Sequence, residues 1–128
     1  MQPRPAIALV VAALAGCALI EPSATDRFSV KPGTSSELVF ACAEKAIHSL
    51  KTQQGEWRDD VTVRDARNGL LETGRFDEVN VIGIRTQVKY DPITGEGRIK
   101  VKASGPYFSD LGAEQAASDL ASGVSQCM

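Results

Sequence analysis

Aromatic side chains, histidine and an excess of positive charge are scarce in this 128-residue chain. Phe, Trp and Tyr make up 5% of the residues, which leaves few rings on which nucleic-acid bases could stack. Lys and Arg number 14 against 16 Asp and Glu, and the formal net charge is −2. Because nucleic-acid-binding domains usually carry a strong basic excess, this composition argues against nucleic acid as a partner.

The sequence also lacks the residue patterns of common metal, phosphate and catalytic sites. It has no Cys-x-x-Cys pair, no Cys/His cluster and no glycine-rich phosphate loop. Its one histidine, His48, has no nucleophile motif beside it, so we expect a partly exposed helix residue and not a general base. The pairs Asp59-Asp60 and Asp77-Glu78 lie at predicted turns, where adjacent acids seldom act in catalysis or bind a cation. We therefore expect no catalytic residues, no metal, no cofactor and no enzyme activity.

The one long hydrophobic run lies at the N-terminus and is short for a membrane span. It extends from Ala6 to Ile20, 15 residues, and Arg4 precedes it. A spanning helix needs about 20 residues, so a transmembrane helix is the weaker of two interpretations. A charged start, an apolar run and small residues before a possible cut are typical of a cleaved secretory signal.

The tetrapeptide Leu14-Ala15-Gly16-Cys17 resembles the lipobox of bacterial lipoprotein precursors. The resemblance implies that residues 1–16 are a cleaved signal peptide and that Cys17 becomes the first mature residue. It also implies that Cys17 carries lipid, a diacylglycerol and a palmitate, so that the exported protein is anchored in a membrane. Ala18 follows, where an aspartate would favour inner-membrane retention, so the outer membrane facing the periplasm is expected.

With Cys17 lipidated, Cys42 and Cys127 remain as a pair. An exported chain meets an oxidising compartment, where such a pair usually forms a disulfide, and two free thiols are the alternative. A redox-active pair is disfavoured because redox cysteines usually lie close together in sequence.

The mature chain of 112 residues is long enough for one small domain. Residues 17–34 contain two prolines and a glycine and follow neither helix nor strand periodicity. We expect them to form a largely extended tether between the anchor and the domain, with Phe28 and Val30 able to dock on the domain. The folded domain is then residues 35–128.

Apolar periodicity predicts a helix at each end of this domain. The first spans residues 35–52, with Thr34 and Glu37 at capping-box spacing and Gly55 as its stop. Its apolar face comprises Val39, Cys42, Ala43, Ala46, Ile47 and Leu50. The second begins near Asp110, a good N-cap, and its apolar face is Ala113, Ala116, Ala117, Leu120, Val124 and Cys127.

Alternating apolar and polar residues predict four strands between the helices. Strands at 61–64 and 70–76 flank Asn68-Gly69, a strong hairpin signal. Strands at 82–90 and 98–103 flank the turn residues 91–97. The predicted fold class is α+β: a two-layer sandwich of helix, two β-hairpins (four antiparallel strands) and helix, with both helices on one sheet face.

The second hairpin gathers positive charge on the face predicted to point away from the helices. The members of this predicted basic face are Arg85, Lys89, Arg98, Lys100 and Lys102, opposed by the inward residues Ile82, Ile84, Val88, Ile99 and Val101. Arg64 could extend it. The face could bind anionic lipid head groups, lipopolysaccharide phosphates or an acidic envelope protein. The alternative is a solvated face, or charged strands that resist aggregation.

Two roles remain open for the aromatic residues: packing in the core or binding a partner. Trp57 and the pair Tyr107-Phe108 are expected to pack in or beside the core, or, if exposed, to anchor a partner. Taken together, the sequence predicts a lipid-anchored bacterial envelope lipoprotein, a non-enzymatic accessory, scaffold or assembly component at the outer membrane. The alternative is a periplasmic carrier or binding module for an amphipathic or anionic ligand, such as lipid or lipopolysaccharide, held between helices and sheet.

Overall fold

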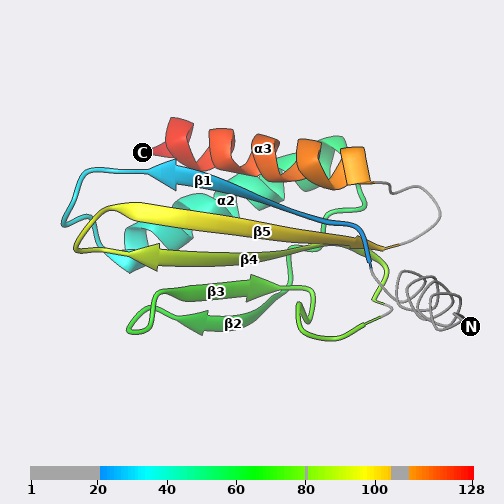
Figure 1. The fold of residues 1–128 in the computed structure, drawn as a ribbon, viewed down its shortest axis with the longest axis horizontal. Coiled ribbons are helices and arrows are strands. Elements are labelled where there is room, and N and C mark those ends of the chain that lie inside the picture. The colour runs from blue at the N-terminus through cyan, green and yellow to red at the C-terminus, as the bar shows by residue number, and fades with distance from the viewer. Residues whose placement is uncertain (1–20, 80, 105–109) are drawn as a thin grey trace, which may run out of the picture.

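A computed structural model describes residues 21–79, 81–104 and 110–128. The lipobox and Cys17 lie outside the described residues, as do Tyr107 and Phe108. The elements follow the order β1 (Ser23–Ser29), α2 (Ser36–Gln53), β2 (Val61–Asp65), β3 (Leu70–Thr73), β4 (Gly83–Asp91), β5 (Glu96–Ser104) and α3 (Asp110–Cys127) (Figure 1). No helix in the described ranges is both long and apolar enough to cross a membrane.

The strands form one open antiparallel sheet in the order β1-β5-β4-β3-β2. The α+β class and both hairpins are as predicted, but the sheet has five strands and not four. The additional strand, β1, lies inside the 17–34 segment for which we expected an extended tether. It pairs with the free edge of β5 from Ser23–Lys102 to Ser29–Glu96, so cross-strand pairing orders a segment whose local pattern is weak.

Phe28 explains why β1 is held to the sheet. It is 4% exposed and lies opposite Gly97, where the missing side chain leaves room for its ring. The ring stacks on that of Tyr90 across β5, with centroids 6.2 Å apart. Val30 packs against the core, and its N–H donates to the Gly95 carbonyl oxygen at 2.8 Å. Phe28 and Val30 thus both dock on the domain.

The two helices lie close to their predicted limits, but their caps differ. Ser35, and not Thr34, is the N-cap of α2, because its Oγ accepts from the Leu38 N–H at 3.2 Å. The Thr34 hydroxyl instead donates to the Lys31 carbonyl oxygen at 2.7 Å. The helix ends at Gln53 with Gln54 as its C-cap, one residue before the predicted stop.

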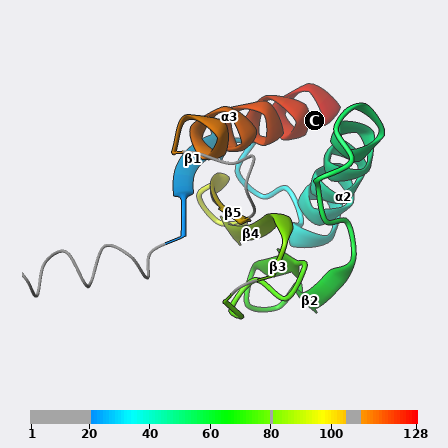
Figure 2. The ribbon, with the colours of Figure 1, turned by 90° about the vertical axis from the view of Figure 1, so that its right-hand side faces the viewer.

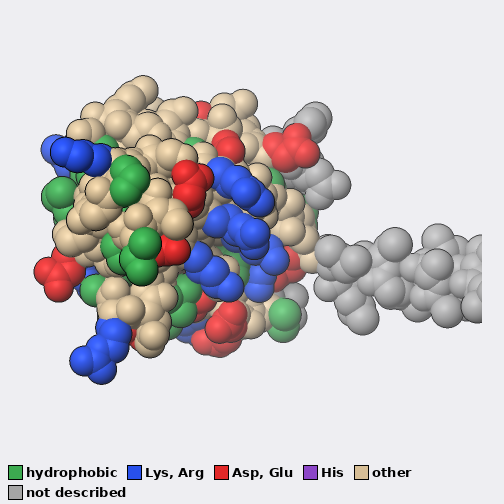
Figure 3. Space-filling view, turned by 60° about the vertical axis from the view of Figure 1, so that its left-hand side comes forward, with side chains coloured by type: hydrophobic (Ala, Val, Ile, Leu, Met, Phe, Trp, Pro, Cys, Tyr) green, Lys and Arg blue, Asp and Glu red, His purple; other side chains and the backbone are tan. Residues whose placement is uncertain are grey.

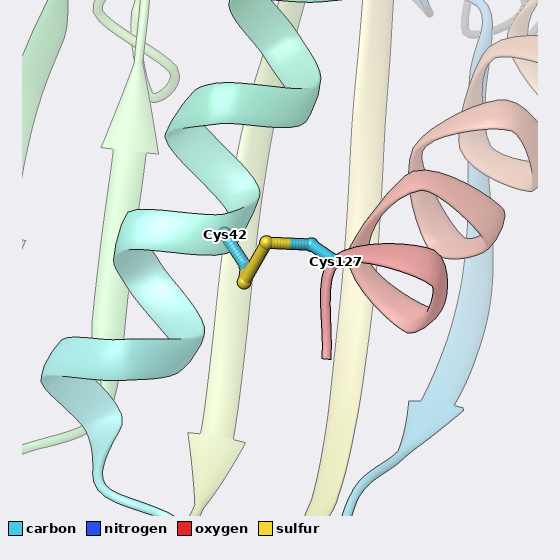
Figure 4. Close-up of a disulfide and its surroundings, with 2 residues drawn as sticks. All are labelled: Cys42 and Cys127. Atoms are coloured by element: carbon cyan, nitrogen blue, oxygen red, sulfur yellow. A yellow bond between two sulfur atoms is a disulfide. The ribbon is translucent and has the colours of Figure 1, made fainter.

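Both helices cover the same face of the sheet (Figure 2). The α3 helix packs on β1 and β5, α2 packs on β4, and the helices pack on each other. A side chain at Gly123 would meet the Ala46 Cβ at 2.9 Å, so the small residues of α3 permit a close helix–helix approach. Cys42 on α2 and Cys127 on α3 are disulfide-bonded, with their Cα atoms 5.6 Å apart (Figure 4).

The core between the layers is filled with large side chains. The largest fully buried apolar members are Trp57, Phe40, Ile47, Leu71, Ile84, Ile99 and Leu120. Trp57 therefore packs in the core, and an isolated β-bridge joins it to Ile84 of β4. Most strand limits lie within two residues of the predicted ones, but β3 ends at Thr73, three residues early. Ile82, which was expected to face inward at the start of β4, precedes that strand and is 73% exposed. The described residues between these strands are 74–79, 81 and 82, and we call them the 74–82 loop.

Candidate functional site

The sheet face away from the helices carries a row of cations across three neighbouring strands. Arg27 on β1 lies opposite Arg98 on β5, and Arg98 lies opposite Lys89 on β4. All three side chains are exposed. Among the described residues none of them forms an ion pair, so three positive charges stand side by side without an acidic partner.

Lys100 adds a fourth cation beside this row. It lies two residues after Arg98 on β5, on the same face, and its cross-strand neighbours are Thr25 and Gln87. Its side chain is half-buried and forms no ion pair within the described ranges. We call Arg27, Lys89, Arg98 and Lys100 the basic patch. Figure 3 shows Lys and Arg side chains gathered on one face of the molecule, with Asp and Glu side chains beside them.

Acidic residues border the basic patch but are held by other groups. At one end Glu96 accepts from the Ser29 hydroxyl at 2.7 Å, and Asp91 accepts from the Ile93 N–H at 2.9 Å. Towards β3, Glu72 is buried and accepts from the Gln87 side-chain amide at 2.7 Å. These acids dilute the positive field without neutralising any member of the patch directly.

A shallow depression of about 440 Å³ lies over the row of three cations. Arg27, Lys89 and Arg98 line it together with Leu70, Gly97 and two acidic residues at one end, Asp91 and Glu96. It can receive a small anionic head group, because two guanidinium groups and one ammonium reach it from three strands and no side chain of another layer covers it.

Arg85 was predicted to belong to this face, and the prediction that it is exposed is wrong. Its side chain points to the outward side of β4 but is 0% exposed. Its Nη2 donates to Glu21 Oε2 at 2.6 Å and its Nη1 donates to the Glu78 carbonyl oxygen at 2.6 Å. Strand alternation gave the correct side, but the 74–82 loop folds over that end of the sheet and covers it.

The environment of Glu21 explains its ionisation. Burial opposes the charged form, but the hydrogen bond and positive charge of Arg85 outweigh it, assisted by Ser104 and Lys102. The pKa of Glu21 is therefore held below its ordinary value of 4.5. The ion pair buries the Arg85 charge with a partner, as a buried guanidinium requires.

Lys102 and Arg64 also lie outside the basic patch. Lys102 is half-buried: its Nζ donates to the Phe76 carbonyl oxygen at 3.1 Å and lies 4.5 Å from the centre of the Phe76 ring. Arg64 on β2 forms an ion pair with Glu44 of α2 and so does not extend the patch. Of the five predicted residues, the structure brings together Lys89, Arg98 and Lys100.

Arg27 was missed because it lies in the segment assigned to the tether. A signal was present, since Ala24, Asp26 and Phe28 alternate with Ser23, Thr25, Arg27 and Ser29. A polar residue at an inward position and prolines on both sides obscured that alternation. The alternation becomes clear only once β1 is paired with β5.

His48 lies in an exposed ionic cluster on the surface of α2, with its side chain 73% exposed. Its Nδ1 lies 3.4 Å from Asp59 Oδ2, and Lys51 Nζ lies 2.9 Å from Asp59 Oδ1. The hydrogen bond from Lys51 is the main reason that the pKa of Asp59 lies below its usual value. Across the described parts of the chain, no group of three His, Cys, Asp or Glu side chains could hold a metal ion.

Two further depressions lie on outer surfaces. One of about 500 Å³ runs between α2 and α3 near Ala46 and Gly123, and one of about 320 Å³ lies beside Asp26 and Ser122. The first is lined by residues of the two helices, and the second lies at the sheet edge where α3 meets β1, while core side chains fill the interior between the layers.

No protein-family model matches the chain, and no curated protein is similar to it in sequence.

Proposed function

We propose that the protein is a lipid-anchored, non-enzymatic accessory or scaffold component of the bacterial envelope that binds phosphate-bearing lipid surfaces through its basic patch. The lipobox-like residues before Cys17 support the anchor, and Ala18 supports the outer membrane. The observation that carries the binding function is the row of Arg27, Arg98 and Lys89 on an uncovered sheet face.

Like charges directly opposite one another in a sheet are destabilising, with side chains about 5 Å apart. Two acids, Asp91 and Glu96, lie on the same face, two residues along their strands from Lys89 and Arg98. Here none of the three has an ion pair among the described residues. A phosphate placed between them relieves the repulsion, and the two arginines can each offer a bidentate fork to its oxygens.

Protection of a sheet edge does not account for the row. Charged residues on edge strands discourage aggregation, and Arg27 on the edge strand β1 would serve that purpose. Arg98 and Lys89, however, lie on β5 and β4, which have a neighbouring strand on both sides. The interior position of these two cations favours a binding role over edge protection.

The carrier hypothesis has less support than surface binding. A carrier needs a cavity between the helical layer and the sheet, and such pockets usually measure about 300–1,000 Å³. In this protein Phe40, Trp57 and Ile47 fill that space. The depression of about 440 Å³ over the patch lies on the outside and suits a head group better than an acyl chain.

Vesicle binding tests the proposal. The chain from Ala18 onward, which lacks both the lipidated cysteine and the apolar signal segment, is titrated with zwitterionic vesicles, with vesicles containing anionic phospholipid, and with vesicles containing lipopolysaccharide. We expect binding only to the last two, weakening as salt rises from about 0.1 M to about 1 M, where the Debye length falls from about 10 Å to about 3 Å. The two anionic surfaces distinguish phospholipid phosphate from lipopolysaccharide phosphate.

Two matched variants assign the binding to the patch. Arg98→Glu reverses one charge in the row, and Lys45→Glu makes the same change on the exposed surface of α2. Each cation contributes about 1 kcal/mol near an anionic surface, so reversal of Arg98 should weaken binding about 30-fold. The proposal fails if the unsubstituted patch shows no salt-sensitive binding to either surface, or if Lys45→Glu weakens it equally.

A further inference from the structure

The chain enters the sheet almost immediately after the proposed anchor. Glu21 follows Cys17 by four residues, which span at most about 14 Å when fully extended. Pro22 already belongs to the sheet, since its carbonyl oxygen accepts from the Ala103 N–H at 3.0 Å. If Cys17 carries lipid, as the proposed function holds, the domain has little freedom to leave the membrane surface.

A single guanidinium joins this entry point to the 74–82 loop. Arg85 donates to the Glu21 carboxylate and to the Glu78 carbonyl oxygen, both at 2.6 Å, while Phe76 and Val81 bury the loop against the domain. In Figure 1 the start of β1, the end of β5 and the connection from β3 to β4 lie at the same end of the sheet. The position of the loop relative to Glu21 is therefore fixed.

The same loop exposes two large aliphatic side chains. Val79 is 68% exposed and Ile82 is 73% exposed, although neighbouring Val81 and Phe76 are buried. Val79 directly follows Glu78, whose carbonyl oxygen shares the Arg85 guanidinium with Glu21. Apolar side chains so close to a lipid anchor can enter the boundary between head groups and acyl chains. The exposed acids Asp77 and Glu78 restrict such entry to that boundary.

The loop and the basic patch lie on the same side of the sheet. Arg85, which the loop covers, shares the outward face with Lys100 and Arg98 through the register of β4 and β5. We infer that the domain lies with this outward face against the membrane that holds its anchor: Val79 and Ile82 insert at the boundary, and the basic patch contacts the anionic head groups beyond them. The two contacts and the short chain before Glu21 set one orientation.

Site-specific quenching tests the orientation on the full lipidated protein. Single cysteines replace Val79, Ile82 or Ile93, and each carries an environment-sensitive fluorophore while Cys42 and Cys127 stay oxidised. The protein is reconstituted in vesicles of zwitterionic and anionic phospholipid containing nitroxide-labelled lipid. Ile93 is the matched control, an 84% exposed isoleucine in the β4–β5 turn at the opposite end of the sheet.

We expect lipid nitroxide to quench the labels at 79 and 82 severalfold more than the label at 93. Glu21→Gln should reduce this difference by weakening the tie to Arg85, whereas Glu56→Gln, at an exposed carboxylate, should leave it unchanged. Equal quenching at all three positions in protein with lipidated Cys17 overturns the inference while leaving the anchor intact. Labels at 79 and 82 that are shielded from water but unreached by lipid nitroxide also overturn it, because a protein then covers the loop. Mass spectrometry of the same sample that finds Cys17 without lipid overturns the proposed function, and this inference with it.

Discussion

Arg85, near the start of the central strand β4, forms its ion pair with Glu21, 64 residues earlier, and the loop that follows β3 covers the guanidinium. The guanidinium is 0% exposed and Glu21 retains only 17% of its side-chain exposure. The pair therefore fixes the N-terminal segment at the place where the chain arrives from the proposed anchor. It also makes the segment sensitive to substitution and to acid.

Removal of Glu21 should destabilise the domain. Breaking a buried pair by deleting one partner costs about 3–5 kcal/mol, and the partial exposure of Glu21 should lower this to about 2–3 kcal/mol for Glu21→Ala. Urea unfolding measures the change. Glu56→Ala, at an exposed carboxylate, should change the free energy of unfolding by less than about 0.5 kcal/mol. Equal effects of the two substitutions would mean that the Arg85 pair contributes nothing specific.

The same pair predicts an acid dependence. Because the folded state lowers the pKa of Glu21, the pair stabilises the protein above the ordinary value of 4.5. This contribution is lost as pH falls through the lowered pKa, since the unfolded chain takes up the proton first. The stability difference between the unsubstituted protein and Glu21→Gln should be constant near neutral pH and shrink below about pH 4.5. A difference that grows on acidification would contradict this assignment.

Phe28→Ala should loosen β1. Truncating a buried phenylalanine costs about 3–5 kcal/mol, and Phe28, whose ring lies over Gly97, is the one fully buried residue of β1. Hydrogen exchange should show faster exchange in the β5 amides that pair with β1. Ile93→Ala, at an 84% exposed side chain, is the control and should change neither stability nor exchange. Unchanged β5 protection in Phe28→Ala would contradict the pairing of β1 with β5.

The disulfide should contribute much of the stability of this small domain. Cys42 and Cys127 close a loop of 85 residues, for which the chain-entropy model gives about 4–5 kcal/mol. Cys127→Ser, at an exposed position, should lower the melting temperature in oxidising buffer, and a reductant should then cause little further loss. Peptide mapping without reductant should recover the two cysteines joined; two alkylated free thiols would exclude the bridge.

Local sequence patterns predicted the helices and both hairpins, but not the loop that covers Arg85 or the strand β1. Strand alternation located both hairpins and gave the correct side for Arg85 and Lys89, because side-chain direction in a strand follows from position alone. It could not show that the 74–82 loop buries Arg85, since that contact joins residues with no common local pattern. Strand β1 was missed for a similar reason: Phe28 finds its partners, Gly97 and Tyr90, about 60–70 residues later.

In the basic patch, too, residues joined by local pairing could be predicted, and the residue joined by distant pairing could not. Lys89, Arg98 and Lys100 could be predicted because one hairpin carries them all, and the pairing of β4 with β5 is local. Arg27 joins them only through pairing between distant strands. The prediction of a basic face on one hairpin was thus partly right. It missed Arg27, because the order of the segment that carries Arg27 depends on tertiary contacts.

Mass spectrometry of Cys17 tests the central claim, that this domain is held at a membrane by lipid. The protein is expressed at full length in a bacterial host, and the membrane fraction is digested and analysed. We predict a mature N-terminal peptide that begins at Cys17 and carries diacylglycerol and a fatty acyl group, with full-length precursor accumulating in Cys17→Ser. An unmodified Cys17 peptide recovered from abundant mature protein would contradict the account.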